Sequence, residues 1–136
     1  MSDLISLTVL TGVLGTMLTL ATPLLFAAVG ETFSQNSGVV NLGVDGIMLI
    51  GGFAAYYVVL TTGSLWGGVV LSMAVGLLMG LIMSVVSVSL KAEQGVSGIG
   101  LQMFGLGMSS LLFKVLVGTV RTVRGFPRLT IPFLSD

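Results

Sequence analysis

The chain has 136 residues, of which 54% are hydrophobic and 7% are charged, and its five basic and five acidic residues cancel. Soluble domains carry about a quarter charged residues, so this chain is expected to have lipid as its main solvent. It contains no cysteine and no histidine, which argues against disulfides, metal centres and nucleophile–base catalysis. Zero net charge argues against nucleic-acid binding.

The first predicted membrane span covers residues 4–29, long enough for the roughly 20 helical residues that a bilayer core needs. Pro23 lies late in this span and predicts a kink, because it removes one backbone hydrogen bond. Glu31 follows directly. A carboxylate inside a membrane is costly and usually functional, but polar neighbours such as Thr32 and Ser34 equally suit a position in interfacial water. Both readings stay open.

The second predicted span covers residues 39–60, and its first part carries polar and flexible residues: Asn41, Gly43, Asp45 and Gly46. Its purely apolar part, residues 47–60, would rise only about 21 Å as a helix. This is short for a full span, so we expect the polar beginning to lie at membrane depth as a helix break. Asn41 or Asp45 could simply cap a helix, or the break could face a solute path.

The third and fourth predicted spans cover residues 65–90 and 96–120. Short connections precede both, and short connections make neighbouring helices antiparallel. Residues 121–136 are expected to form a loop or tail. The predicted fold is therefore an all-α integral membrane protein with about four transmembrane helices, a broken, glycine-rich second helix, and a single transmembrane domain over residues 1–136.

Small residues recur at helical spacing in the last two spans. Those of the third span, four residues apart, are Ser72, Gly76, Gly80 and Ser84. Such a face lets another helix approach closely. Packing within the bundle is the simpler interpretation, and a contact with another subunit is the alternative. In the fourth span, Gly98 and Gly105 are likewise interpreted as helix-packing positions.

Three short runs carry a family resemblance: PLLFAA at 23–28, GETFS at 30–34 and SGVVNLGVDG at 37–46. Together they resemble the N-terminal signature of inner-membrane permeases of ABC importers for nucleosides and simple sugars, relatives of the ribose-type and branched-chain amino-acid permeases. GVSGIGL at 95–101 and GLG at 105–107 are similar to the next span of the same family. Asp45 stands where the family usually has Glu.

The resemblance implies a multi-pass permease subunit of a bacterial-type inner membrane that does no covalent chemistry and needs no cofactor. It implies a second permease subunit, separate cytosolic ATPases and an extracytoplasmic solute-binding lipoprotein as partners. Family permeases are longer, so the chain corresponds to an N-terminal half, and we expect a truncated or split permease.

Break and resemblance together predict a translocation path at Glu31, Asn41, Gly43, Asp45 and Gly46. The alternative is a small four-helix membrane protein with a structural or assembly role and no transport of its own. The transported solute is not readable from the residues.

Overall fold

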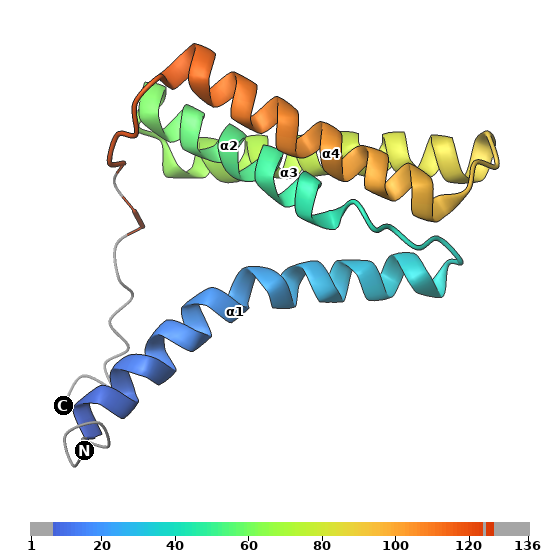
Figure 1. The fold of residues 1–136 in the computed structure, drawn as a ribbon. Coiled ribbons are helices and arrows are strands. Elements are labelled where there is room, and N and C mark those ends of the chain that lie inside the picture. Colours follow the sequence, from blue (N-terminus) through green and yellow to red (C-terminus); the bar gives the residue numbers. More distant parts are fainter. Residues whose placement is uncertain (1–6, 124, 127–136) are drawn as a thin grey trace. The chain divides into compact units, whose positions relative to one another are not determined.

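The computed structural model describes residues 7–123 and 125–126. These residues form four long helices: α1 (Leu7–Asn36), α2 (Val44–Thr62), α3 (Leu65–Ser84) and α4 (Gln94–Leu112) (Figure 1). Two π-helical turns, η2 (Val85–Ser89) and η3 (Phe113–Val117), extend α3 and α4. All four helices are long and apolar enough to cross a membrane, which confirms the predicted helical membrane fold.

The chain divides into two compact units, Met1–Asn41 and Leu42–Asp136. In the first unit, α1 is 30 residues long and contains Pro23, and it changes direction along its length (Figure 1). It continues past residue 29, where the first span was expected to end. The polar residues there remain helical because their side chains bond locally: the Thr32 hydroxyl donates to the Ala28 carbonyl at 2.8 Å.

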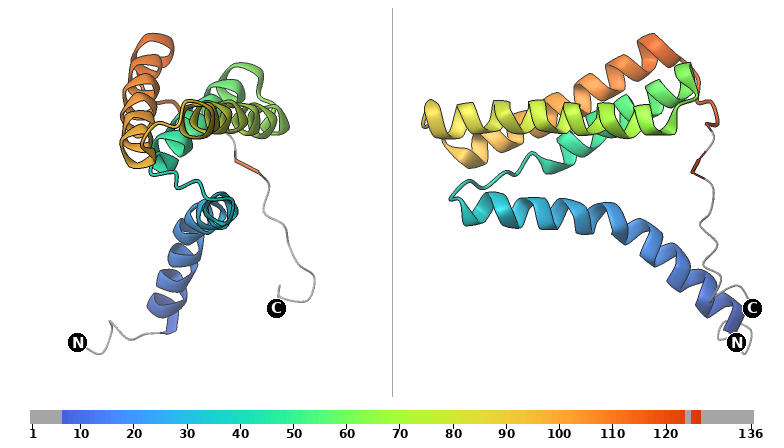
Figure 2. Two further views of the ribbon diagram at one scale, coloured as in Figure 1. Left: turned by 90° about the vertical axis from the view of Figure 1, so that its right-hand side faces the viewer. Right: turned by 180° about the vertical axis from the view of Figure 1, so that it is seen from behind.

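In the second unit, α2 and α3 form an antiparallel pair, and α4 returns alongside them (Figure 2). Gly63 ends α2 in the left-handed region, with φ of 70°. Ser64 then caps α3, because its hydroxyl accepts from the Gly67 N–H at 3.1 Å. A Cβ at Gly68 would lie 3.0 Å from the Ala55 carbonyl oxygen, so the pair packs closely near this turn.

The buried apolar core of the second unit is small and lies between α2, α3 and α4. Met79 and Met83 are each 3% exposed and contact Leu101. Ile47 and Ile50 of α2 pack against them. Most other large apolar side chains are exposed, as expected for helices that face lipid.

Both π-helical turns end their helices with wide backbone hydrogen bonds. After α3, the Leu90 N–H donates to the Val85 carbonyl at 3.0 Å, and Lys91 takes a φ of 53°. After α4, the Gly118 N–H donates to the Phe113 carbonyl at 3.0 Å. Of the expected tail, residues 121–123 and 125–126 are non-helical; residues 124 and 127–136 lie outside the described residues.

Candidate functional site

The helices are interrupted between α1 and α2, at residues 37–43. The expected break in the second span therefore lies at its beginning. Asn41 and Gly43 are in the non-helical segment, whereas Asp45 and Gly46 are in the first turn of α2. The Gly43 carbonyl accepts the first helical bond from the Ile47 N–H at 3.1 Å.

Glu31 holds the end of the first unit together. Its Oε1 accepts from the Asn41 backbone N–H at 2.9 Å and from the Gln35 side-chain amide at 3.1 Å. Both Glu31 and Asn41 are half-buried. The carboxylate thus bridges ten residues of chain and ties the extended segment back to α1. The carboxylate thereby holds the Asn41 backbone in place relative to the end of α1, which is a positioning role.

The turn after α1 is fixed by further local bonds. The Ser34 hydroxyl donates to the Val39 carbonyl at 2.8 Å, and the Val39 N–H donates to the Ser34 carbonyl at 3.1 Å. Gly38 adopts a φ of 86°, a conformation that favours glycine. These bonds satisfy backbone groups that a break inside a membrane would otherwise leave unpaired.

The beginning of α2 lies directly against α4. A Cβ built at Gly98 would lie 2.7 Å from the Leu42 backbone nitrogen, and one built at Gly46 would lie 2.6 Å from the Gln102 Cα. A Cβ built at Gly105 would lie 2.7 Å from the Gly46 Cα. We call Gly46, Gly98 and Gly105 the glycine contact; only glycine fits this approach of two backbones.

The residues at the interruption differ in solvent exposure. Gly43 and Gly46 are buried, whereas Asp45 is exposed at the first turn of α2, where the helix dipole favours an acid. Within the described part of the chain, no three His, Cys, Asp or Glu residues gather as metal ligands. The groups here can offer hydrogen bonds and a negative charge to a solute.

The small residues of α3 have a different environment. The Ser72 carbonyl lies 3.7 Å from a Cβ position at Gly51, so the row of small residues on α3 contacts α2 at its Ser72 end. Among the described residues, no atom lies within 4 Å of a Cβ at Gly76 or Gly80, and Ser84 is exposed. The side of α3 that packs instead carries Gly68, Met79 and Met83.

Two residues at these helix contacts were not singled out from the sequence. Gln102 is half-buried and flanks Gly46; a lone amide four residues after Gly98 was the available signal. The Tyr56 hydroxyl accepts from the Arg121 N–H at 3.0 Å and donates to the Arg121 carbonyl at 2.7 Å. No sequence pattern announces that bond, because it joins residues 65 positions apart.

Comparison with known proteins gives one family. The profile of the family described as "Branched-chain amino acid transport system / permease component" matches residues 13–134. No solved structure matches the chain.

Three curated proteins are similar to the chain. TsgC13 of Haloferax volcanii, provisionally named a glucose ABC transporter permease protein, is 34% identical over 91% of this chain and 37% of its own length. The guanosine ABC transporter permease protein NupQ of Bacillus subtilis is 35% identical over 85% of this chain and 39% of its own length. The nucleoside ABC transporter permease protein NupC of Lactococcus lactis is 33% identical over 91% of this chain and 42% of its own length. The chain thus spans about two fifths of the length of these relatives.

Proposed function

The chain belongs to the family of branched-chain amino acid transport system permease components, and from this premise we propose that it forms part of the membrane path of an ABC importer for nucleosides or simple sugars. The three similar proteins are named for guanosine, nucleoside and glucose transport. The interrupted backbone before α2 supports a path, because non-helical backbone at membrane depth lines a cavity, water or other protein.

The family and the four apolar helices make the chain a multi-pass protein of the cell membrane. The family is a permease component and is not itself catalytic. We propose that separate ATPase subunits hydrolyse ATP, that a second permease subunit completes the pair, and that an external binding protein delivers the solute.

Each residue at the interruption has its own part in this proposal. Asn41 and Asp45 are the candidates for solute contact, since an amide and a carboxylate can bond the hydroxyls of a sugar or ribose. Glu31 positions Asn41, because its carboxylate accepts from the Asn41 backbone and the Gln35 side chain. Gly46 holds the beginning of α2 against α4. The observation that carries the proposal is this fixed, non-helical segment in a chain of permease ancestry.

The test is uptake of labelled guanosine and labelled glucose by cells that carry the whole transport system, with Asn41→Leu or Asp45→Leu in this chain. Asn41→Leu keeps the backbone bond to Glu31, and Asp45 is exposed, so both variants should fold. We expect uptake to fall about tenfold, the factor that about 1.4 kcal/mol of lost hydrogen bonding represents.

Thr16→Leu is the matched control, because Thr16 is an exposed polar residue of α1 whose hydroxyl bonds within its own helix. Co-purification of the ATPase subunits reports assembly in all three variants. Normal uptake by both Asn41→Leu and Asp45→Leu, with assembly intact, would remove the solute path from this segment. Absence of ATPase subunits from the wild-type complex would argue against the importer itself.

A further inference from the structure

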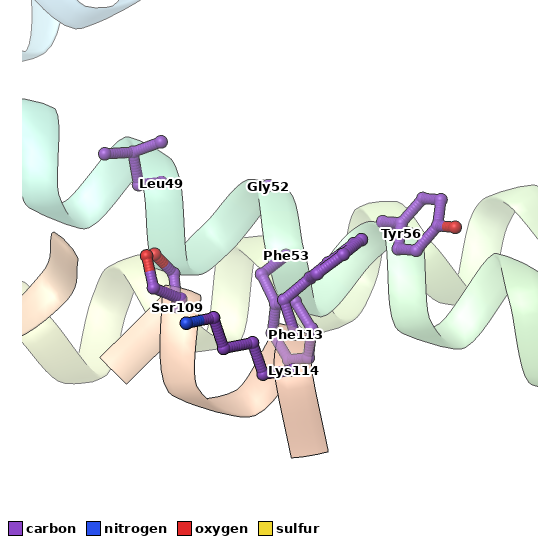
Figure 3. A pocket seen from close by; sticks show the side chains of 8 residues that line it. Leu49, Gly52, Phe53, Tyr56, Ser109, Phe113 and Lys114 are labelled. Carbon is purple, nitrogen blue, oxygen red and sulfur yellow. The ribbon is translucent and has the colours of Figure 1, made fainter. Parts of the chain in front are cut away.

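A groove lies between the later parts of α2 and α4, away from the glycine contact. Its volume is about 430 Å³, within the range of small-molecule sites. Leu49, Gly52 and Tyr56 of α2 form one side, and Ser109, Phe113 and Lys114 form the other (Figure 3). Along α2 the groove begins at Leu49, three residues or about 5 Å after Gly46, and extends to Tyr56, ten residues or about 15 Å after Gly46, so it lies beyond the glycine contact.

Lys114 places a positive charge in this groove. Among the described residues that line it, none is acidic. Figure 3 shows the lysine ammonium turned back along the groove toward Ser109. Lys114 stands three residues before the end of the apolar helix at Val117, about 5 Å along the axis. A lysine this near the end of a membrane helix can reach the interface, where it meets lipid phosphates.

The groove has the polar residues Ser109 and Lys114 on its α4 side and an apolar surface at Gly52 and Leu49 on its α2 side. Tyr56 and Lys114 are at the end near the helix termini, and Leu49 is seven residues earlier on α2, about 10 Å deeper. In the part of the chain that the structure describes, no atom lies within 4 Å of a Cβ position at Gly52, and Leu49 is 45% exposed. An acyl chain could therefore lie over Gly52 and Leu49 while its phosphate stays beside Lys114.

The Tyr56 end of the groove is structurally fixed. Tyr56 exchanges two hydrogen bonds with the Arg121 backbone, and its ring lies 6.0 Å from that of Phe113. Aromatic side chains are enriched at the membrane interface because they combine an apolar ring with a polar group. A fixed aromatic wall reduces the ordering cost for whatever binds beside it.

We propose that this groove holds one anionic phospholipid, with its phosphate at Lys114 and an acyl chain over Gly52 and Leu49. The lysine supplies the charge, and the apolar part of the groove matches a hydrocarbon chain. The lipid would bind at the same level as the Tyr56–Arg121 bond and stabilise the ends of α2 and α4 together.

Native mass spectrometry of the purified complex tests this, with phosphatidylglycerol and phosphatidylcholine of identical acyl chains as probes. We expect one phosphatidylglycerol to bind in preference to phosphatidylcholine. Lys114→Gln should weaken phosphatidylglycerol binding about fivefold, the effect of one basic residue near an anionic lipid. Gly52→Leu should weaken binding of both lipids, because its side chain occupies the space of the acyl chain.

Lys91→Gln is the matched control: it removes the same charge from an exposed residue in the connection between α3 and α4 and should leave phosphatidylglycerol binding unchanged. The proposal is overturned by equal binding of the two lipids, or by equal losses in Lys114→Gln and Lys91→Gln. Displacement of the lipid by guanosine or glucose would also overturn it, since the groove would then belong to the solute. An unchanged melting temperature of each variant in lipid-free detergent shows that folding is not the cause.

Discussion

On α4, Gly98 and Gly105 are buried against the beginning of α2, whereas on α3, Gly76 and Gly80 have no neighbouring atom within 4 Å of a Cβ position. Both pairs put small residues on one face of an apolar helix, and both were interpreted from spacing as packing positions. The difference lies in the partner. Gly46 of α2 also lacks a side chain, so two backbones meet there. Small residues permit close approach, and the facing residue decides whether it occurs.

The largest expected effect comes from adding one methyl group at the glycine contact. In Gly46→Ala the new Cβ would meet the Gln102 backbone, and in Gly105→Ala it would meet the Gly46 backbone. Backbone cannot move aside as a side chain can, so we expect each variant to lose about 3 kcal/mol of unfolding free energy, at the upper end of overpacking costs. Denaturant unfolding in detergent micelles measures this.

The controls come from the same two helices. Gly52 on α2 and Gly107 on α4 have no atom of the described residues within 4 Å of a Cβ position. Alanine there should be neutral or stabilise by up to about 1 kcal/mol, because it restricts the unfolded chain. If Gly52→Ala destabilised as much as Gly46→Ala, the loss would reflect glycine replacement in general and not the contact.

The sequence was sufficient for the features that depend on composition. Four apolar runs predicted four membrane helices, and the residues at 41–46 predicted a break in the second one, whereas the interruption lies at residues 37–43 and Asp45 and Gly46 are helical. It was insufficient where the outcome depends on a partner surface. Nothing in the spacing of Gly76 and Gly80 says that α3 packs through Gly68, Met79 and Met83 instead. Similarly, the sequence left Glu31 equally suited to water or to a solute. Its partner is the backbone N–H of Asn41, and a bond to backbone leaves no pattern in the sequence.

The next largest effect is expected at Glu31. Glu31→Ala removes the acceptor for the Asn41 N–H and the Gln35 amide, and hydrogen bonds to a charged group contribute about 2 kcal/mol. We expect the segment after α1 to loosen, seen as faster amide exchange of Asn41. Glu31→Gln keeps an acceptor oxygen and should retain most of the protection.

This pair of variants also separates positioning from solute contact. If the Asn41 amide stayed equally protected in Glu31→Ala, the bond would not hold the segment. If Glu31→Gln abolished uptake while the amide remained protected, the charge itself would face the solute, and Glu31 would join Asn41 and Asp45 in the path.

A smaller effect is expected on the small-residue side of α3. Gly76→Ala and Gly80→Ala place a methyl group in open space, so unfolding free energies should stay within about 1 kcal/mol of wild type, with any change stabilising. The measurement is the same denaturant series as for Gly46→Ala. A loss near 3 kcal/mol in either variant would mean that α3 packs through this side too, and the contrast with α4 would fail.

The smallest expected effect distinguishes the beginnings of the same two helices by pH. Glu93 caps α4 by accepting from the Gly95 N–H at 2.9 Å and from the Val96 N–H, and these bonds hold the pKa of its carboxyl below the ordinary value of 4.5. α3 is capped by the Ser64 hydroxyl, which does not titrate. A lowered folded pKa means that the cap stabilises α4 above pH 4.5 and that this stabilisation is lost as the pH falls below it. The amide proton shift of Val96 should therefore titrate with a midpoint below 4.5, and that of Gly67 should stay flat. Glu93→Gln should abolish the titration at Val96; equal titration of both amides would show that acid acts on the whole bundle and not on the α4 cap.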